Sequence, residues 1–291
     1  MTMTRTEAAP ARPAAQAATA GPTMAVQLLG RRESWVSLLF LLVFLAAWQW
    51  LPGALGMPEF IIPSLSTVMA EFARMLETER LLFHTGITAA EVVVGFAIGS
   101  LLGMFIGYML GMSPTAEFVL SPYILALQIA PKVAFAPLFV MWFGYTAYPK
   151  IVVAVLIVFF PVMINVLGSV RTIDPQMINL ARSFSASRWQ IFRMIEFPAS
   201  MPPLFAGLRI GSTLAVIGVV VGELVGGNTG LGYLLVFGEG QANTAMVFVT
   251  IILLTLIGII AYVAVILLER RILHYMPRRK FGIDTDQGGK S

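Results

Sequence analysis

Four ionisable side chains stand inside long apolar stretches of this sequence, at Glu91, Lys132, Arg209 and Glu223. A charge at membrane depth is costly, so such a group usually faces a cavity, a partner or a polar interior. Lys132 would either meet an anionic or polar solute or bind a backbone carbonyl or Glu223 within the protein. Glu223 would act as a gate or lie at an interface. Arg209 is expected to extend to the inner interface, and Glu91 to lie at the outer end of its stretch.

Other kinds of chemistry find little support in the residue types. The chain has no cysteine, which excludes thiolate metal sites and cysteine nucleophiles. Its two histidines, His84 and His274, stand far apart in the sequence, so no metal site is predicted. No Ser–His arrangement and no cluster of carboxylates supports an enzyme embedded in the membrane, so we predict no catalytic residue. The sequence also lacks a G-x-x-x-x-G-K-S/T phosphate loop, so no cofactor is expected in this chain.

The elements that position these charges must lie in a lipid bilayer. Hydrophobic residues make up 58% of the 291 residues and charged residues only 12%, with a mean hydropathy of +0.84. A soluble domain carries about 25% charged residues. This composition excludes a cytosolic enzyme and a disordered protein. The net charge of +4 does not indicate nucleic-acid binding, because the basic residues flank apolar stretches and form no single patch.

Six apolar stretches are each long enough to cross about 30 Å of hydrocarbon as a helix. They cover residues 35–51, 86–111, 118–143, 151–167, 203–226 and 245–268. Pro131 and Pro137 each lack a backbone donor, so the third stretch is predicted to break near 128–132. The domain prediction is therefore a disordered cytoplasmic tail over 1–30, a membrane domain over 31–275 and a second cytoplasmic tail over 276–291.

The distribution of Lys and Arg predicts the orientation. With the N-terminus in the cytoplasm, that side holds fourteen of them: four in the N-terminal tail, four in 168–202 and six in the C-terminal tail. The opposite side holds three, two in 53–85 and one in 144–150. Because cytoplasmic loops carry the excess of basic residues, both termini are predicted to be cytoplasmic. Residues 59–80 on the outer side have helical apolar spacing, which predicts an amphipathic helix at the outer interface, capped by Ser64.

Glycines recur at four-residue spacing in two of the stretches. Glycine at this spacing leaves a shallow groove in which a second helix can approach closely. Two readings remain open: tight packing within one subunit, or helices that slide against one another during a working cycle. The predicted packing glycines are Gly95, Gly99, Gly103, Gly107, Gly111, Gly218 and Gly222.

The segment 168–202 is polar, basic and helical in pattern. Asp174 followed by proline predicts a helix N-terminus, with Ile178, Ala181 and Phe184 on one face of a short helix. A second short helix is predicted from Ser187, with Pro198 ending it. Such a segment either docks a cytoplasmic partner or only returns the chain to the membrane.

The run from Asn179 to Pro198 resembles the EAA loop of ABC importer permeases. That pattern is Glu-Ala-Ala, three residues, Gly, nine residues, Ile, one residue and Leu-Pro. The matching residues are Ala181, Ile195 and Pro198, and the departures are Asn179, Leu180, Ser185 and Phe197. Further runs are similar to the nitrate, sulfonate, taurine and pyrimidine-precursor permeases. They are Ile62-Pro63-Ser64, Ala136-Pro137-Leu138-Phe139, Trp142-Phe143-Gly144, Ala206-Gly207-Leu208-Arg209-Ile210-Gly211, Gly222-Glu223-Leu224 and Gly230-Leu231-Gly232.

The resemblance covers roughly residues 35 to 275 and implies an all-α, multi-pass type I ABC importer permease with the MetI-like fold, in the bacterial inner membrane. It implies cytoplasmic ATPase subunits that bind ATP and Mg, a periplasmic or lipid-anchored substrate-binding protein, and a second permease copy, with a homodimer expected. Residues implied at the ATPase contact are Asn179, Ala181, Arg182, Ser185, Arg188 and Pro198. The expected translocation-path residues are Gln128, Lys132 and Glu223.

An ion-coupled secondary transporter that uses Lys132 and Glu223 is the alternative. Many such carriers contain internal repeats. No convincing repeat relates residues 35–143 to residues 151–268.

Overall fold

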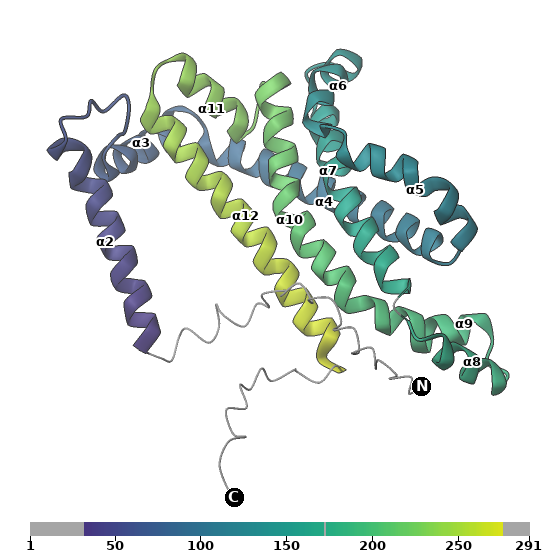
Figure 1. Cartoon of the computed structure of the whole chain (residues 1–291). Coiled ribbons are helices and arrows are strands. Elements are labelled where there is room, and N and C mark those ends of the chain that lie inside the picture. Colours follow the sequence, from purple (N-terminus) through teal and green to yellow (C-terminus); the bar gives the residue numbers. More distant parts are fainter. Residues whose placement is uncertain (1–31, 172, 276–291) are drawn as a thin grey trace, which may run out of the picture. The chain divides into compact units, whose positions relative to one another are not determined.

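A computed structural model describes residues 32–171 and 173–275, so the two predicted tails lie outside the described residues. Within the described ranges every regular element is a helix (Figure 1). The α-helices are α2 (Arg32–Ala54), α3 (Leu65–Thr78), α4 (Leu81–Gly111), α5 (Pro114–Ile129), α6 (Ala136–Phe143), α7 (Ala147–Arg171), α8 (Pro175–Ser183), α9 (Arg188–Ile191), α10 (Phe197–Gly226), α11 (Leu231–Gly240) and α12 (Thr244–Ile272). A 3-10 turn covers Lys132–Phe135, a π-helical turn Phe192–Glu196 and a short 3-10 turn Leu273–Tyr275.

The spans confirm the predicted all-α membrane fold. Five described helical stretches are long and apolar enough to cross a bilayer: Trp35–Ala54, Leu81–Gly111, Ala147–Arg171, Arg188–Gly226 and Thr244–Ile272. A sixth span is formed if α5 and α6 count as one bent crossing. The chain divides into two compact units after Leu45. Of the first unit the structure describes the apolar beginning of α2, and all that follows concerns the second unit.

The third predicted stretch is broken at the expected place. The axes of α5 and α6 differ by 77° across the intervening turn. Ala130 is extended, with ψ of 135°, because the ring of Pro131 disfavours helical geometry in the residue before it. The break places Lys132 in the 3-10 turn between the two helices.

α7 lies between α4 and α10, and glycines on both neighbours allow the close approach. A Cβ atom built on Gly103 would lie 2.7 Å from the carbonyl oxygen of Phe159, and one on Gly222 would lie 2.6 Å from Cα of Lys150. Both distances are too short for real atoms, so these helices pack backbone against backbone. The other α4 glycines that face α7 are Gly95, Gly99, Gly107 and Gly111, and Gly218 on α10 faces it as well.

The amphipathic helix after α2 is α3, and Ser64 caps it by accepting a hydrogen bond from the Thr67 backbone N–H at 3.3 Å. One face of α3 packs against α12 and buries Val68 and Met75, and the place of this helix at the outer interface stays a prediction. The Asn243 amide donates to the Glu71 carboxylate at 2.8 Å. The Arg74 guanidinium, helped by this amide, holds the pKa of Glu71 below its ordinary value.

Pro198 does not end the second short helix, which corrects the sequence prediction. Helical structure is continuous from Arg188 to Gly226. The backbone widens into a π turn directly before the proline, where the Phe197 N–H bonds to the Phe192 carbonyl. Proline has no N–H for the regular bond, and the π turn carries the chain through that position. The predicted loop 168–202 is therefore largely helical.

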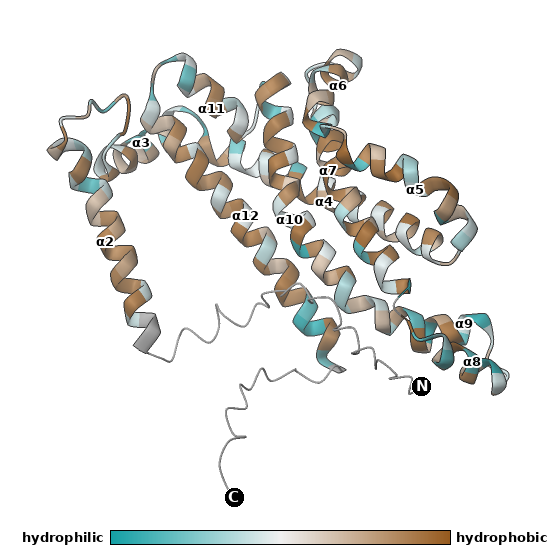
Figure 2. Cartoon of the chain, in the orientation of Figure 1, coloured by the Kyte–Doolittle hydropathy of each residue, from teal (hydrophilic) through white to brown (hydrophobic). Residues whose placement is uncertain are grey.

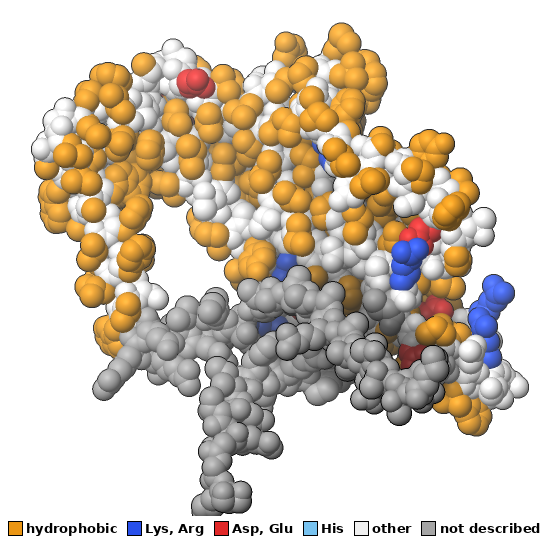
Figure 3. Space-filling model, viewed as in Figure 1, with side chains coloured by type: hydrophobic (Ala, Val, Ile, Leu, Met, Phe, Trp, Pro, Cys, Tyr) orange, Lys and Arg blue, Asp and Glu red, His pale blue; other side chains and the backbone are white. Residues whose placement is uncertain are grey.

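The long helices are mostly apolar, whereas α8 and α9 are more hydrophilic. Figure 2 shows apolar residues along most of α7, α10 and α12, and a concentration of hydrophilic residues on α8 and α9. In Figure 3, apolar side chains cover most of the described surface on the visible face, and several charged side chains lie toward the end that holds α8 and α9. Apolar surface of this extent is stable in lipid and not in water.

Candidate functional site

Lys132 faces a cavity of about 400 Å³ that Gln128, Phe160 and Asn165 also line. Its ammonium donates to the backbone carbonyl of Gln128 at 2.6 Å and lies 4.7 Å from the centre of the Phe160 ring. In the described part of the chain no ion pair includes Lys132. A cation held only by a carbonyl and an aromatic face keeps donor capacity for an anionic or polar molecule.

Glu223 lies apart from that cavity, buried to 1% exposure. Its carboxylate accepts hydrogen bonds from the Thr88 hydroxyl and the Gly232 backbone N–H, each at 2.7 Å. It therefore caps the N-terminus of α11, where the helix dipole favours negative charge. Gly230 turns around the carboxylate with φ of +107°, and a Cβ there would collide with it. The structure thus places Gln128 and Lys132 together but not Glu223.

The sequence reasoning missed a buried ion pair next to this cap. Lys150, counted as part of an outer loop, is 2% exposed, and its ammonium lies 3.0 Å from a carboxylate oxygen of Glu91. The ammonium also donates to the Thr229 carbonyl at 3.1 Å. The pair joins α7 to α4. The only signal in the sequence was a lysine directly before an apolar stretch, which does not identify its partner.

Arg209 also has a partner that the sequence did not predict. Its guanidinium in α10 lies 3.4 Å from the Glu269 carboxylate in α12. Both side chains are less than one-fifth exposed, so the pair joins two spanning helices. Arg209 was predicted only to extend to the inner interface, and that prediction did not include its ion pair with Glu269.

The segment between α7 and α10 carries the residues implied at an ATPase contact. Asp174 caps α8 by accepting from the Gln176 N–H at 2.8 Å, as predicted. Asn179, Arg182 and Arg188 are exposed. Ala181 and Pro198 are half-buried, and Pro198 lies in the first turn of α10 rather than in the loop.

α8 ends in a tight turn although the glycine of the EAA pattern is absent. The Ser185 N–H bonds to the Arg182 carbonyl at 2.9 Å, and the Ala186 N–H bonds to the Ala181 carbonyl at 3.1 Å. These two bonds form a Schellman motif, which needs a left-handed residue after the helix. Ser185 takes that conformation with φ of +58°, so serine preserves the turn under strain.

Ser185→Gly should stabilise this turn by about 1 kcal/mol, because glycine adopts positive φ without steric cost. Hydrogen–deuterium exchange of the Ser185-turn amides in the purified protein should slow by about fivefold. The matched control is Ser183→Gly, which places glycine in the last turn of α8 and should speed exchange there. Equal protection in both variants would show that Ser185 is not strained.

The exposed apolar face of α8 is its most unusual surface feature. Met177, Leu180 and the C-cap residue Phe184 recur at helical spacing and are 53%, 61% and 80% exposed. The predicted face of this helix joined Phe184 with Ile178 and Ala181 instead, but those two residues are half-buried. An unpartnered apolar helix face beside polar and basic residues is typical of a helix that fits into a groove of another protein.

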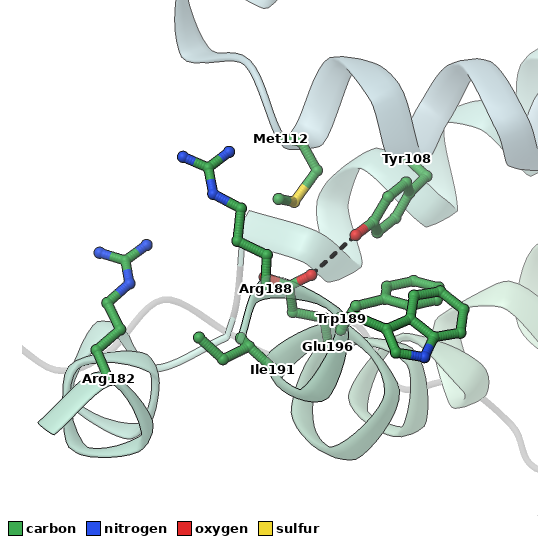
Figure 4. A pocket seen from close by; sticks show the side chains of 8 residues that line it. Tyr108, Met112, Arg182, Arg188, Trp189, Ile191 and Glu196 are labelled. Atoms are coloured by element: carbon green, nitrogen blue, oxygen red, sulfur yellow. Dashed lines mark hydrogen bonds between the residues drawn. The ribbon is translucent and has the colours of Figure 1, made fainter. Parts of the chain in front are cut away.

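A pocket of about 590 Å³ lies between the end of α4 and the segment that follows α8. Figure 4 shows Tyr108 reaching it from α4 and Met112 from the position directly after α4, with Arg182 of α8 and Arg188 and Trp189 of α9 on the other side. The Tyr108 hydroxyl donates to the Glu196 carboxylate at 2.8 Å across the pocket.

Comparison with known proteins gives a consistent assignment. The model of a family described as "Binding-protein-dependent transport system inner membrane component" matches residues 99–274. The riboflavin transport system permease protein RibX of Chloroflexus aurantiacus is 38% identical over 240 residues, which cover 82% of this chain and 88% of that protein. The putative aliphatic sulfonates transport permease protein SsuC of Bacillus subtilis is 31% identical, over 84% of this chain and 89% of its own length.

A solved structure supports the fold. An inward-facing form of the MetNI methionine ABC transporter superposes with a TM-score of 0.52 at 20% identity, covering 68% of this chain and 96% of that chain. At this identity the likeness concerns the fold alone. The family match covers more than half of the chain, and the two relatives cover more than two thirds of it. The chain therefore belongs to the family of binding-protein-dependent transport system inner membrane components and is an ABC importer permease of the nitrate, sulfonate and taurine group.

Proposed function

We propose that this chain is the transmembrane subunit of an ATP-driven importer in the bacterial inner membrane, with both termini in the cytoplasm. It forms the translocation path for a small polar or anionic solute of the sulfonate, nitrate, taurine or pyrimidine and vitamin-precursor class. The names of the relatives support this range, since one is a riboflavin permease and another an aliphatic sulfonate permease.

The observation that carries the proposal is the exposed apolar face of α8, formed by Met177, Leu180 and Phe184. We assign this face to a groove on a cytoplasmic ATPase. We assign Asn179, Ala181, Arg182, Ser185, Arg188 and Pro198 to the same contact. ATP and Mg are then bound by the partner, and this chain needs no cofactor or metal of its own.

The remaining partners follow from the family. A second copy of the permease completes the path in a homodimer, the lipid bilayer surrounds both, and a periplasmic or lipid-anchored binding protein delivers the solute. Nucleic acid has no part in this assembly.

Within the path we assign solute contact to Gln128 and Lys132, whose cavity combines a cation, amide groups and an aromatic wall. Glu223 instead holds α11 in place. The ion-coupled alternative needs Lys132 and Glu223 as a pair, but the two side chains bind different groups. We therefore favour the ATP-driven mechanism.

Phe184→Asp should weaken ATPase binding by at least about 2 kcal/mol, or roughly 30-fold, because a charge replaces an apolar anchor. The test is co-purification of the ATPase with the tagged permease from detergent-solubilised membranes of the native host. Met69→Asp is the control, since Met69 is also an exposed apolar residue but lies on α3. Normal ATPase recovery with Phe184→Asp would refute the docking face, and absence of any ATPase with the unchanged chain would refute the ATP-driven importer.

A further inference from the structure

If α8 docks on an ATPase, as the proposed function on which this section rests requires, its movement must reach the membrane helices through the segment that follows it. α9, the π turn and α10 form one continuous helical rod from Arg188 to Gly226. A displacement of α9 therefore passes directly into α10, and α8 is joined to α9 by the short turn at Ser185. The π turn lies within this rod, and π turns of this kind recur at functional sites in helices.

α4 has no such continuous connection to the segment that follows α8. It reaches that segment through Tyr108, whose hydroxyl donates to Glu196 in the π turn at 2.8 Å. The Tyr108 ring also meets the Phe192 ring edge to face, with centroids 5.1 Å apart. One side chain of α4 thus touches both ends of the π turn.

The Glu196 carboxylate depends on its hydrogen bond from Tyr108. It is 6% exposed, and no ion pair within the described residues includes it. Arg182 and Arg188 line the same pocket, but Figure 4 shows their guanidinium groups directed away from the carboxylate. A buried carboxylate without a cation depends on its hydrogen-bond donor. Breaking the bond to Tyr108 would therefore be costly, so the two partners move together.

The surroundings permit this movement. The pocket of about 590 Å³ beside the bond leaves space on the side of α8 and α9. The glycine faces of α4 and α10 meanwhile hold both helices tightly against α7. α4 and α10 are therefore joined at membrane depth through α7 and through the Thr88–Glu223 hydrogen bond, and at the α8 end through Tyr108 and Glu196.

We propose that the Tyr108–Glu196 hydrogen bond is a positioning contact that makes α4 follow the coupling segment 175–196 when the ATPase moves it. Tyr108 and Glu196 act on neither solute nor ATP. They determine how far the end of α4 that carries Tyr108 follows the displacement of the segment 175–196, whereas the contacts with α7 and between Thr88 and Glu223 hold α4 and α10 together at membrane depth.

The absence of cysteine allows a direct test, because a single introduced cysteine can be labelled specifically. Phe105→Cys reports on α4 and Ile210→Cys on α10, since both side chains are exposed. Each is labelled with an environment-sensitive fluorophore in the complete complex with its ATPase, in nanodiscs. The emission change on adding ATP and vanadate is then measured for each label.

In the otherwise unchanged chain both labels should respond. Tyr108→Phe keeps the ring but removes the hydroxyl. Because a hydrogen bond to a charged group contributes enough for about a tenfold change in an equilibrium, the α4 response should fall by about that factor. The α10 response should persist, because the rod from Arg188 to Gly226 is intact.

Conservative variants separate positioning from folding. Glu196→Gln keeps an acceptor for the hydroxyl and should retain much of the α4 response, whereas Glu196→Ala should lose it. Tyr123→Phe is the matched control at an exposed tyrosine of α5. If Tyr108→Phe leaves the α4 response unchanged, or removes both responses equally, the positioning role is overturned. If neither label responds in the unchanged chain, the proposed coupling to an ATPase is overturned instead.

Discussion

Gly103→Leu should prevent the permease from folding, so that little folded protein is recovered from the membrane. The glycine lies where α4 meets α7, and even a Cβ atom there would lie 2.7 Å from the Phe159 carbonyl oxygen and 3.1 Å from the Met163 nitrogen. These are backbone atoms, which cannot rotate aside as a flexible side chain would. The two helices would have to separate, and the neighbouring glycine contacts would open with them.

Gly86 provides a control in the same helix, because a Cβ there meets nothing within 4 Å. Alanine otherwise favours a helix over glycine by about 1 kcal/mol. Gly86→Ala should therefore preserve or slightly raise the thermal stability of the detergent-solubilised protein, and Gly86→Leu should be tolerated. Gly103→Ala should lower the free energy of unfolding by about 1–3 kcal/mol. Similar shifts at both positions would show that the α4–α7 contact is looser than these distances indicate.

Lys150→Met should destabilise the protein by about 3–5 kcal/mol, because it leaves the Glu91 carboxylate buried without its cation. The second oxygen of that carboxylate is already buried without a hydrogen-bond partner in the structure. Removing the ammonium would also free the Thr229 carbonyl next to the cap of α11. Folded protein recovered after solubilisation, and its thermal unfolding, measure the effect.

A double variant tests whether the charge itself is responsible. Glu91→Gln added to Lys150→Met removes the buried charge and should recover most of the lost stability. Lys132→Met is the matched control, since Lys132 bonds to a carbonyl and pairs with no carboxylate among the described residues. Its cost should be about 1 kcal/mol. A double variant no more stable than Lys150→Met would mean that the lysine acts through packing.

The amino-acid sequence by itself determined the features that depend on local or periodic properties. Apolar length and composition were sufficient for the spans, because a bilayer selects continuous apolar helices. Proline chemistry predicted the break after residue 128, and glycine spacing identified the residues that meet α7. Ser64 and Asp174 were recognisable as helix caps because a cap bonds to residues two or three positions away.

Only the tertiary structure decided which distant groups meet. Glu91 and Lys150 are 59 residues apart, and Thr88 and Glu223 are 135 apart, so no spacing rule connects either pair. The packing of α3 against α12 depends on a helix near the other end of the chain. The π turn before Pro198 is a rare local state, and the positive φ of Ser185 is a strained one. Such states persist because surrounding contacts hold them, and those contacts come from the folded chain.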